Sequence, residues 1–158
     1  MGEDPSESER ESWELSVDGS SCITGSGAGV VLVSPSGWTL EYALRFGFKA
    51  TNNEAEWEAL IAGLTIAKHL EVQRIEASND SQLVVSMACG EYEPREDSMA
   101  GYLSHFWNLK PAFEVLRVMK IPRAENARAD QLSKLATVGE LEKNQTVLVY
   151  YLDKPTIS

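Results

Sequence analysis

Cysteine and long apolar runs are nearly absent from this sequence. The 158 residues include only Cys22 and Cys89, too few for a disulfide framework or a zinc cluster, so we expect a reduced intracellular setting, cytoplasmic or nuclear. No apolar run approaches the roughly 18 residues of a membrane-spanning helix, and no signal-peptide pattern opens the chain. We therefore expect no membrane partner.

Basic residues are also scarce. The chain has 14 Lys and Arg against 24 Asp and Glu, a net charge of −10, which argues against a nucleic-acid partner because phosphate binding normally uses excess positive charge. Residues 1–12 hold five of the acids and one base, and this composition predicts a disordered acidic tail. Residues 13–158 keep a charge of −6, which four carboxylates binding two divalent cations would reduce to about −2.

The 158 residues as a whole are 43% hydrophobic, which is the composition of one domain with a sizeable core plus short tails. Its patterns predict an α/β domain over residues 13–138, with a five-stranded mixed sheet flanked by helices. Residues 139–158 are expected to form a C-terminal linker or tail, with a possible strand at 147–152. The predicted strands are 13–18, 30–33, 38–48, 74–78 and 113–121, with a Gly-rich connection at 24–29, and the predicted helices are 51–70, 82–88, 99–109 and 127–138.

The start of the long helix is the most informative segment. Thr51 and Glu54 fit a capping box. At 100° per residue, Glu54 and Glu58 lie about 40° apart, whereas Glu56 lies roughly 160–200° from both, on the apolar face with Leu60. A buried carboxylate there costs several kcal/mol unless a cation, a partner or a proton neutralises it. Glu56 therefore requires a functional explanation, while Glu54 and Glu58 do not, and we expect their substitution by Gln to be nearly silent.

Three further acids stand where α/β folds place their sites. Asp18 ends the first predicted strand, Asp80 follows the fourth, and Asp130 lies early in the last helix. Together with Glu56 they come from four separate elements, and Mg²⁺ prefers such oxygen ligands. Taken singly, each Asp is explained as a turn, cap or helix-dipole residue, so the argument depends on their joint occurrence.

The four acids lie in four short motifs, which are Val17-Asp18-Gly19-Ser20, Thr51-Asn52-Asn53-Glu54-Ala55-Glu56, Asn79-Asp80-Ser81-Gln82 and Asn126-Ala127-Arg128-Ala129-Asp130. With these motifs the chain resembles the type 1 ribonuclease H family from about Trp13 to Val138. A closer likeness, carried by residues 55–60 and 121–130, is to the domain joined to reverse transcriptase in gypsy-type LTR retrotransposons and to the related archaeal-like enzymes.

The resemblance implies specific roles for these residues. It implies a catalytic metal site of Asp18, Glu56, Asp80 and Asp130 that holds two Mg²⁺ ions, with Mn²⁺ as a substitute. It also implies that an RNA/DNA hybrid is the substrate and that it contacts the five residues Gly19, Ser20, Asn52, Asn53 and Gln82.

Two features depart from the bacterial-type members of the family. Those members carry a catalytic histidine in the loop before the last Asp, whereas His69 and His105 lie on predicted helices and Arg123 occupies that loop. Arg123 is a candidate for contact with a scissile phosphate, or else a surface residue. The basic helix-and-loop handle of some members is missing too, so substrate binding by the domain alone should be weak.

The leading interpretation is a metal-dependent endonuclease that cuts the RNA strand of RNA/DNA hybrids during retrotransposon reverse transcription. We expect a monomer with a reverse transcriptase domain in cis. One alternative is a non-catalytic structural or interaction domain of a polyprotein, against which the four intact acids argue. The other is an exonuclease or integrase-like strand transferase, against which the Asn52-Asn53 pair and the Asp80-Ser81-Gln82 motif argue.

Overall fold

The computed structural model describes residues 12–138 and 149–157. Residues 1–11 of the predicted acidic tail and residues 139–148 lie outside the described residues, whereas Ser12, the last residue of the predicted tail, begins β1. The predicted domain boundaries stay predictions. The elements are β1 (Ser12–Cys22), β2 (Gly25–Val33), β3 (Thr39–Phe46), α2 (Asn52–His69), β4 (Arg74–Asn79), α3 (Gln82–Ala88), α4 (Asp97–Leu109), η1 (Lys110–Ala112), β5 (Val115–Lys120), η2 (Arg123–Asn126), α5 (Ala127–Val138) and β6 (Val149–Leu152).

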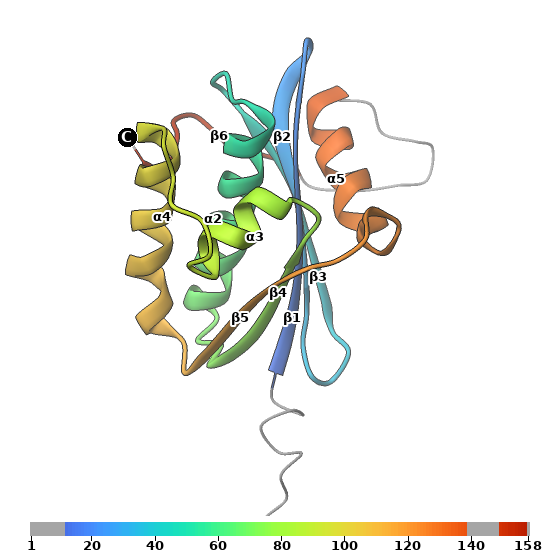
Figure 1. The fold of residues 1–158 in the computed structure, drawn as a ribbon. Coiled ribbons are helices and arrows are strands. Elements are labelled where there is room, and N and C mark those ends of the chain that lie inside the picture. The colour runs from blue at the N-terminus through green and yellow to red at the C-terminus, as the bar shows by residue number, and fades with distance from the viewer. Residues whose placement is uncertain (1–11, 139–148, 158) are drawn as a thin grey trace, which may run out of the picture.

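One mixed sheet, in the order β5-β4-β1-β2-β3-β6, separates two layers of helices. Figure 1 shows α2, α3 and α4 on one face of the sheet and α5 on the other. β1, β2 and β3 form an antiparallel meander, and β4 pairs in parallel with β1 after the crossover through α2. The predicted α/β class with a mixed sheet is therefore confirmed.

The sheet has six strands where the sequence predicts five. The sixth is β6, which pairs in parallel with β3 so that Ala43 lies opposite Val149 and Phe46 opposite Leu152. It coincides with part of the possible strand at 147–152, and residues 147–148 lie outside the described residues. The described part of the predicted linker or tail thus packs on the domain.

The predicted connection at 24–29 is wrong, because residues 25–29 belong to β2. Their glycines answer a packing constraint. A Cβ on Gly29 would lie 2.0 Å from the carbonyl oxygen of Ala129 in α5, and one on Gly27 would lie 2.6 Å from the carbonyl oxygen of Leu44. The glycines let α5 lie close against the sheet. From sequence alone, a run of glycines is more readily interpreted as a turn or connection than as a strand with this packing role.

Helix α2 is buried on two sides. The capping box of Thr51 and Glu54 is present, with both hydrogen bonds formed. Glu56, 6% exposed, faces the sheet as predicted, but Glu58 is 0% exposed, so the expectation that it needs no partner is wrong. Tyr102 of α4 covers the second side, so one apolar stripe does not describe this helix.

None of the described helices is both long and apolar enough to cross a membrane.

The close approach of α5 to β2 predicts a sharp difference between two glycines. Gly29→Ala should destabilise the protein by about 1–3 kcal/mol or more, because the new methyl group overlaps backbone atoms of α5 that have no room to shift. Gly101→Ala is the matched control: its Cβ meets nothing closer than 3.6 Å, and alanine favours the helix. Urea unfolding of both variants measures the difference. Equal stability of the two would contradict this account of the sheet–helix contact.

Candidate active site

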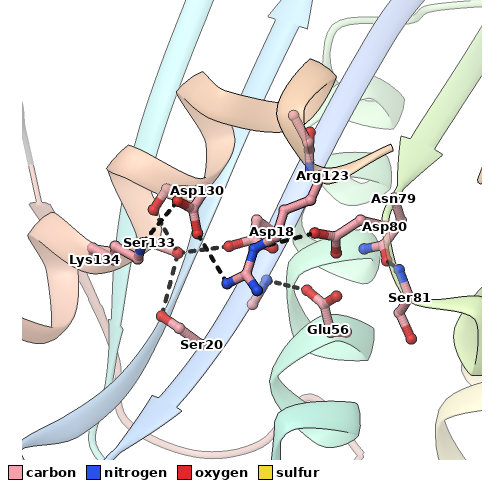
Figure 2. Close-up of polar contacts among 12 residues, drawn as sticks. Asp18, Ser20, Glu56, Asn79, Asp80, Ser81, Arg123, Asp130, Ser133 and Lys134 are labelled. Carbon is pink, nitrogen blue, oxygen red and sulfur yellow. Dashed lines mark hydrogen bonds and ion pairs between the residues drawn. The ribbon is translucent and has the colours of Figure 1, made fainter. Parts of the chain in front are cut away.

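Three carboxylates from three elements meet at one end of the sheet. Ligand oxygens of Asp18, Glu56 and Asp80 lie within 4.8 Å of one another, as Figure 2 shows. Asp18 lies in β1 and Glu56 in α2, and Asp80 is the residue directly after β4. The sequence places Asp18 at the end of its strand, but β1 runs on to Cys22 beside β2; only its pairing with β4 has ended, at Ser16.

The backbone just before Asp18 is fixed by two buried amides. The side-chain nitrogen of Asn126 donates to the carbonyl oxygen of Val17 at 2.8 Å, and that of Asn79 donates to the same oxygen at 3.4 Å. The side-chain oxygen of Asn79 also accepts from the backbone N–H of Ser81 at 2.6 Å. The end of η2, the end of β4 and the middle of β1 are thereby tied at one atom next to the carboxylates.

Asp18 and Glu56, the two buried carboxylates of the cluster, each accept a hydrogen bond from the surrounding structure. The hydroxyl of Ser133 donates to Asp18 at 2.9 Å, and the backbone N–H of Gly19 donates to Glu56. Gly19 also has a steric role, since a Cβ there would lie 2.2 Å from the backbone of Ala55. The first turns of α2 therefore press directly on β1.

Burial and mutual repulsion disfavour the charged forms of this pair. Burial, with the nearby charges of Asp80 and Asp130, raises the pKa of Asp18 to about 7 against the hydrogen bond from Ser133. Burial, with the charges of Asp18 and Asp80, raises the pKa of Glu56 to about 9. Titratable groups perturbed in this way mark sites that use their charge.

Asp130 lies beside this cluster and is paired with cations. Its carboxylate is 2.9 Å from the ammonium of Lys134 and 3.8 Å from the guanidinium of Arg123. Arg123 also lies 4.0 Å from Asp80, and its side chain is 75% exposed. Arg123 therefore bridges two of the acids over the site (Figure 2), on a side chain that is free to move into solvent.

An open cavity of about 740 Å³ lies over the carboxylates. Gln82 is not in its lining: it is exposed on α3, and its amide donates to Ser86 at 2.8 Å. Neither histidine lines the cavity. Nine of the ten predicted site residues do line it, namely Asp18, Gly19, Ser20, Asn52, Asn53, Glu56, Asp80, Arg123 and Asp130.

The cluster fits divalent cations that prefer oxygen. Carboxylate oxygens of Asp18, Glu56 and Asp80 are available within 4.8 Å of one another, and Asp130 is close enough for its charge to act on Asp18. Mg²⁺ binds through a few carboxylates and keeps several waters, which the open cavity accommodates. The residues that could hold such ions are Asp18, Glu56, Asp80 and Asp130.

Three neighbours of the site lie outside the residues predicted to act there. Ser133 is fully buried between Asp18 and Ser20, Lys134 pairs with Asp130, and Asn126 fixes Val17. The spacing of Ser133 and Lys134, three and four residues after Asp130, places them on the same side of α5. That spacing is the signal that could have found them.

Comparison with known proteins agrees with this arrangement. A family model described as reverse transcriptase-like matches residues 16–136. Ribonuclease HI of Halobacterium salinarum is 34% identical over 108 residues, which cover 68% of this chain and 54% of that protein. The matched region thus spans about half the length of this relative.

Solved structures give the same result. The crystal structure of RNase H1 from Halobacterium salinarum has a TM-score of 0.77 at 32% identity, covering 82% of this chain and 99% of that one. LC11-RNase H1, solved in complex with an RNA/DNA hybrid, has a TM-score of 0.73 at 30% identity, covering 80% and 97%. The α/β fold with its acidic cluster defines a ribonuclease H-like class. The chain belongs to the type 1 ribonuclease H family.

The raised pKa values predict how the metal-free protein responds to pH. The folded protein keeps protons on Asp18 and Glu56 up to about pH 7 and 9, whereas the unfolded chain releases them near pH 4. The free energy of unfolding should therefore fall as pH rises from about 4.5 to 9, by up to about 1.4 kcal/mol per pH unit for each retained proton. Thermal melts in a chelator measure this slope.

Variants measure the share of the slope that belongs to Glu56. Glu56→Gln should make the slope shallower between about pH 5 and 7, where Asp18 still holds its proton, and flatten it between about pH 7 and 9, since the amide does not titrate. Glu54→Gln should leave the slope unchanged. Added Mg²⁺ should stabilise the wild-type protein most at high pH, where both carboxylates are ionised. A slope that is the same in wild type and Glu56→Gln would refute the assignment.

Proposed function

We propose that this protein is a metal-dependent endonuclease that hydrolyses the RNA strand of RNA/DNA hybrids. The observation that carries the proposal is the cluster of Asp18, Glu56 and Asp80, with ligand oxygens within 4.8 Å at the floor of an open cavity. Family membership supports it, as does the likeness to a relative solved with an RNA/DNA hybrid. Isolated acids on a surface would lack both this burial and this convergence.

Two divalent cations, Mg²⁺ with Mn²⁺ as a substitute, fit the proposed role. Asp18, Glu56, Asp80 and Asp130 would hold them, and ions so held supply a nucleophile from water at neutral pH and stabilise the leaving oxygen of a phosphodiester. The protein's part is to keep four carboxylates converged despite their repulsion. Ser133 and the Gly19 N–H orient the two buried ones.

The residues at the rim of the cavity are proposed to bind the substrate. Asn52 and Asn53 are exposed at the first turn of α2 and line the cavity, so their amides can reach base edges or sugar hydroxyls of a shallow minor groove. Gly19 and Ser20 line its floor. Gln82, outside the lining, would contact a hybrid only farther along its length.

Arg123 is proposed to stabilise developing charge on the scissile phosphate. Its guanidinium is already held over Asp80 and Asp130, and a guanidinium matches two phosphate oxygens at once. It does not act as a general base, because it stays protonated at any working pH. Because Arg123 is paired with two of the acids that would hold the metal ions, a phosphate bound to those ions would lie within its reach.

We further propose a role in retrotransposon reverse transcription with a polymerase domain in cis, which the closer sequence likeness and the reverse transcriptase-like family model support. A monomeric nuclease in an intracellular setting is part of the same proposal. The body of the chain is acidic, so hybrid binding by the domain alone should be weak and steeply dependent on salt. A linked polymerase domain would compensate by raising the local concentration of the substrate.

Cleavage of a labelled RNA/DNA hybrid tests the proposed activity directly. Wild-type protein should cut the RNA strand with Mg²⁺ and not with a chelator, and should leave single-stranded and double-stranded controls intact. Asp80→Asn should abolish cutting and weaken Mg²⁺ binding in calorimetry, because carboxylates supply most of the attraction for a hard cation. Glu54→Gln, which keeps the helix cap, is the matched control. An inert wild-type protein that binds Mg²⁺ would favour the non-catalytic alternative.

Arg123 makes a separate prediction. Arg123→Ala should lower kcat by about 10²–10³-fold, the usual cost of one lost electrostatic contact to a transition state, with little change in folding. Arg123→Lys should recover only part, because a point charge lacks the bidentate fork. Single-turnover cleavage at saturating Mg²⁺ measures both. Wild-type rates in Arg123→Ala would make this residue a bystander.

A further inference from the structure

Glu58 is a buried carboxylate that the metal cluster does not use. It lies two residues after Glu56 on the opposite side of α2 and is 0% exposed. The hydroxyl of Tyr102 donates to its Oε2 atom at 2.5 Å, and the backbone N–H of Thr156 donates to the same atom at 3.0 Å. A group of this kind keeps its place only while both donors stay.

One of those donors belongs to the C-terminal segment, Val149–Ile157. The segment first adds β6 to the edge of β3, where the Gly47 N–H donates to the carbonyl oxygen of Leu152 at 2.8 Å. It then crosses to the helical layer, and Figure 1 shows the C-terminus beside α4. There Ile157 packs against Gly101, 3.6 Å from the position of a Cβ. The segment therefore connects the sheet edge with the helices over α2.

Helix α2 is held between this segment and the active site. On the sheet side, the Gly19 N–H donates to Glu56, and a Cβ at Gly19 would overlap Ala55. On the outer side, Trp57 stacks on Tyr102 with ring centroids 6.4 Å apart and planes 4° apart. One turn of α2 is therefore held from two sides, through Glu56 on the sheet side and through Glu58 on the outer side.

We propose that Glu58 and the C-terminal segment form a clasp that positions Glu56 in the metal cluster. Glu58 is a positioning residue: it touches neither substrate nor the metal-binding carboxylates, and it acts through the placement of α2. The inference rests on the proposed function for its consequence in catalysis, but the clasp itself is a property of the folded, metal-free protein.

The Thr156 N–H offers a specific test in the 158-residue chain. Thr156→Pro removes the donor, and Thr156→Ala keeps it while removing a hydroxyl that is buried without a hydrogen-bond partner. Mg²⁺ binding by calorimetry should weaken by about 10-fold or more in Thr156→Pro, the usual loss when support behind a metal ligand is removed. Thr156→Ala should bind Mg²⁺ as wild type does. All titrations are made well below the melting temperature of each variant.

A second readout does not depend on metal or activity. The amide proton of Gly19 reports its hydrogen bond to Glu56, so its NMR shift and its hydrogen exchange should change in Thr156→Pro and in Glu58→Gln without any cation present. Tyr102→Phe, which removes the other donor and keeps the ring stack, should act in the same direction. It also serves as the variant of choice if Thr156→Pro does not fold.

The outcomes separate the clasp from the proposed activity. If the wild-type protein cuts no RNA/DNA hybrid, the proposed activity is wrong, but the Mg²⁺ titration and the Gly19 amide signal still test the clasp. Variants that melt at lower temperature but keep wild-type Mg²⁺ affinity and an unchanged Gly19 amide would overturn the proposal, because a purely structural strap predicts that pattern. An increase in the Mg²⁺ concentration for half-maximal cleavage, with kcat preserved at saturation, would support it.

Discussion

Repulsion among the carboxylates is the constraint on which the rest of the structure depends. Asp18, Glu56 and Asp80 converge within 4.8 Å, and two of them are buried from water. Such a cluster opposes folding unless protons or cations neutralise it. The packing that surrounds it must therefore supply the free energy that holds it together.

The neighbouring backbone shows how that convergence is enforced. Two buried asparagine amides share the carbonyl oxygen of Val17, so the strand that carries Asp18 cannot shift without breaking contacts to β4 and η2. Gly19 and Gly29 remove the side chains that would hold α2 and α5 away from β1 and β2. At both glycines the backbone of a helix lies directly against the backbone of a strand, and backbone atoms shift less readily than side chains do.

Local chemistry explains which parts of this arrangement were predictable. The helical phase of Glu56 and the cap at Thr51 depend on near neighbours in sequence, and both were correct. Glu58 was misjudged because a helical wheel assumes one buried face, while α2 is covered by the sheet and by α4. The strand at residues 25–29 is not predicted because its glycines make room for α5, which lies about 100 residues away in the chain, so no neighbouring residue indicates their role.

Contacts between segments that are distant in sequence also explain why the motifs do not indicate every residue of the candidate site. All four acids were named from their motifs, whereas the roles of Ser133 and Asn126 follow from where α5 lands on the sheet. The pairing of Arg123 with Asp80 and Asp130 likewise needs the three-dimensional approach of η2 to β4. No pattern within one segment encodes such approaches.

The two edges of the sheet are protected in different ways. β5 carries Arg117 and Lys120 along its exposed edge, and charged side chains there discourage pairing with another chain. The β3 edge is covered instead by β6, which is only four residues long. A molecule that lost β6 would present an uncovered strand ending in the buried Phe46. By covering this edge, β6 would also protect the molecule against aggregation, a role separate from the chemistry of the carboxylate cluster.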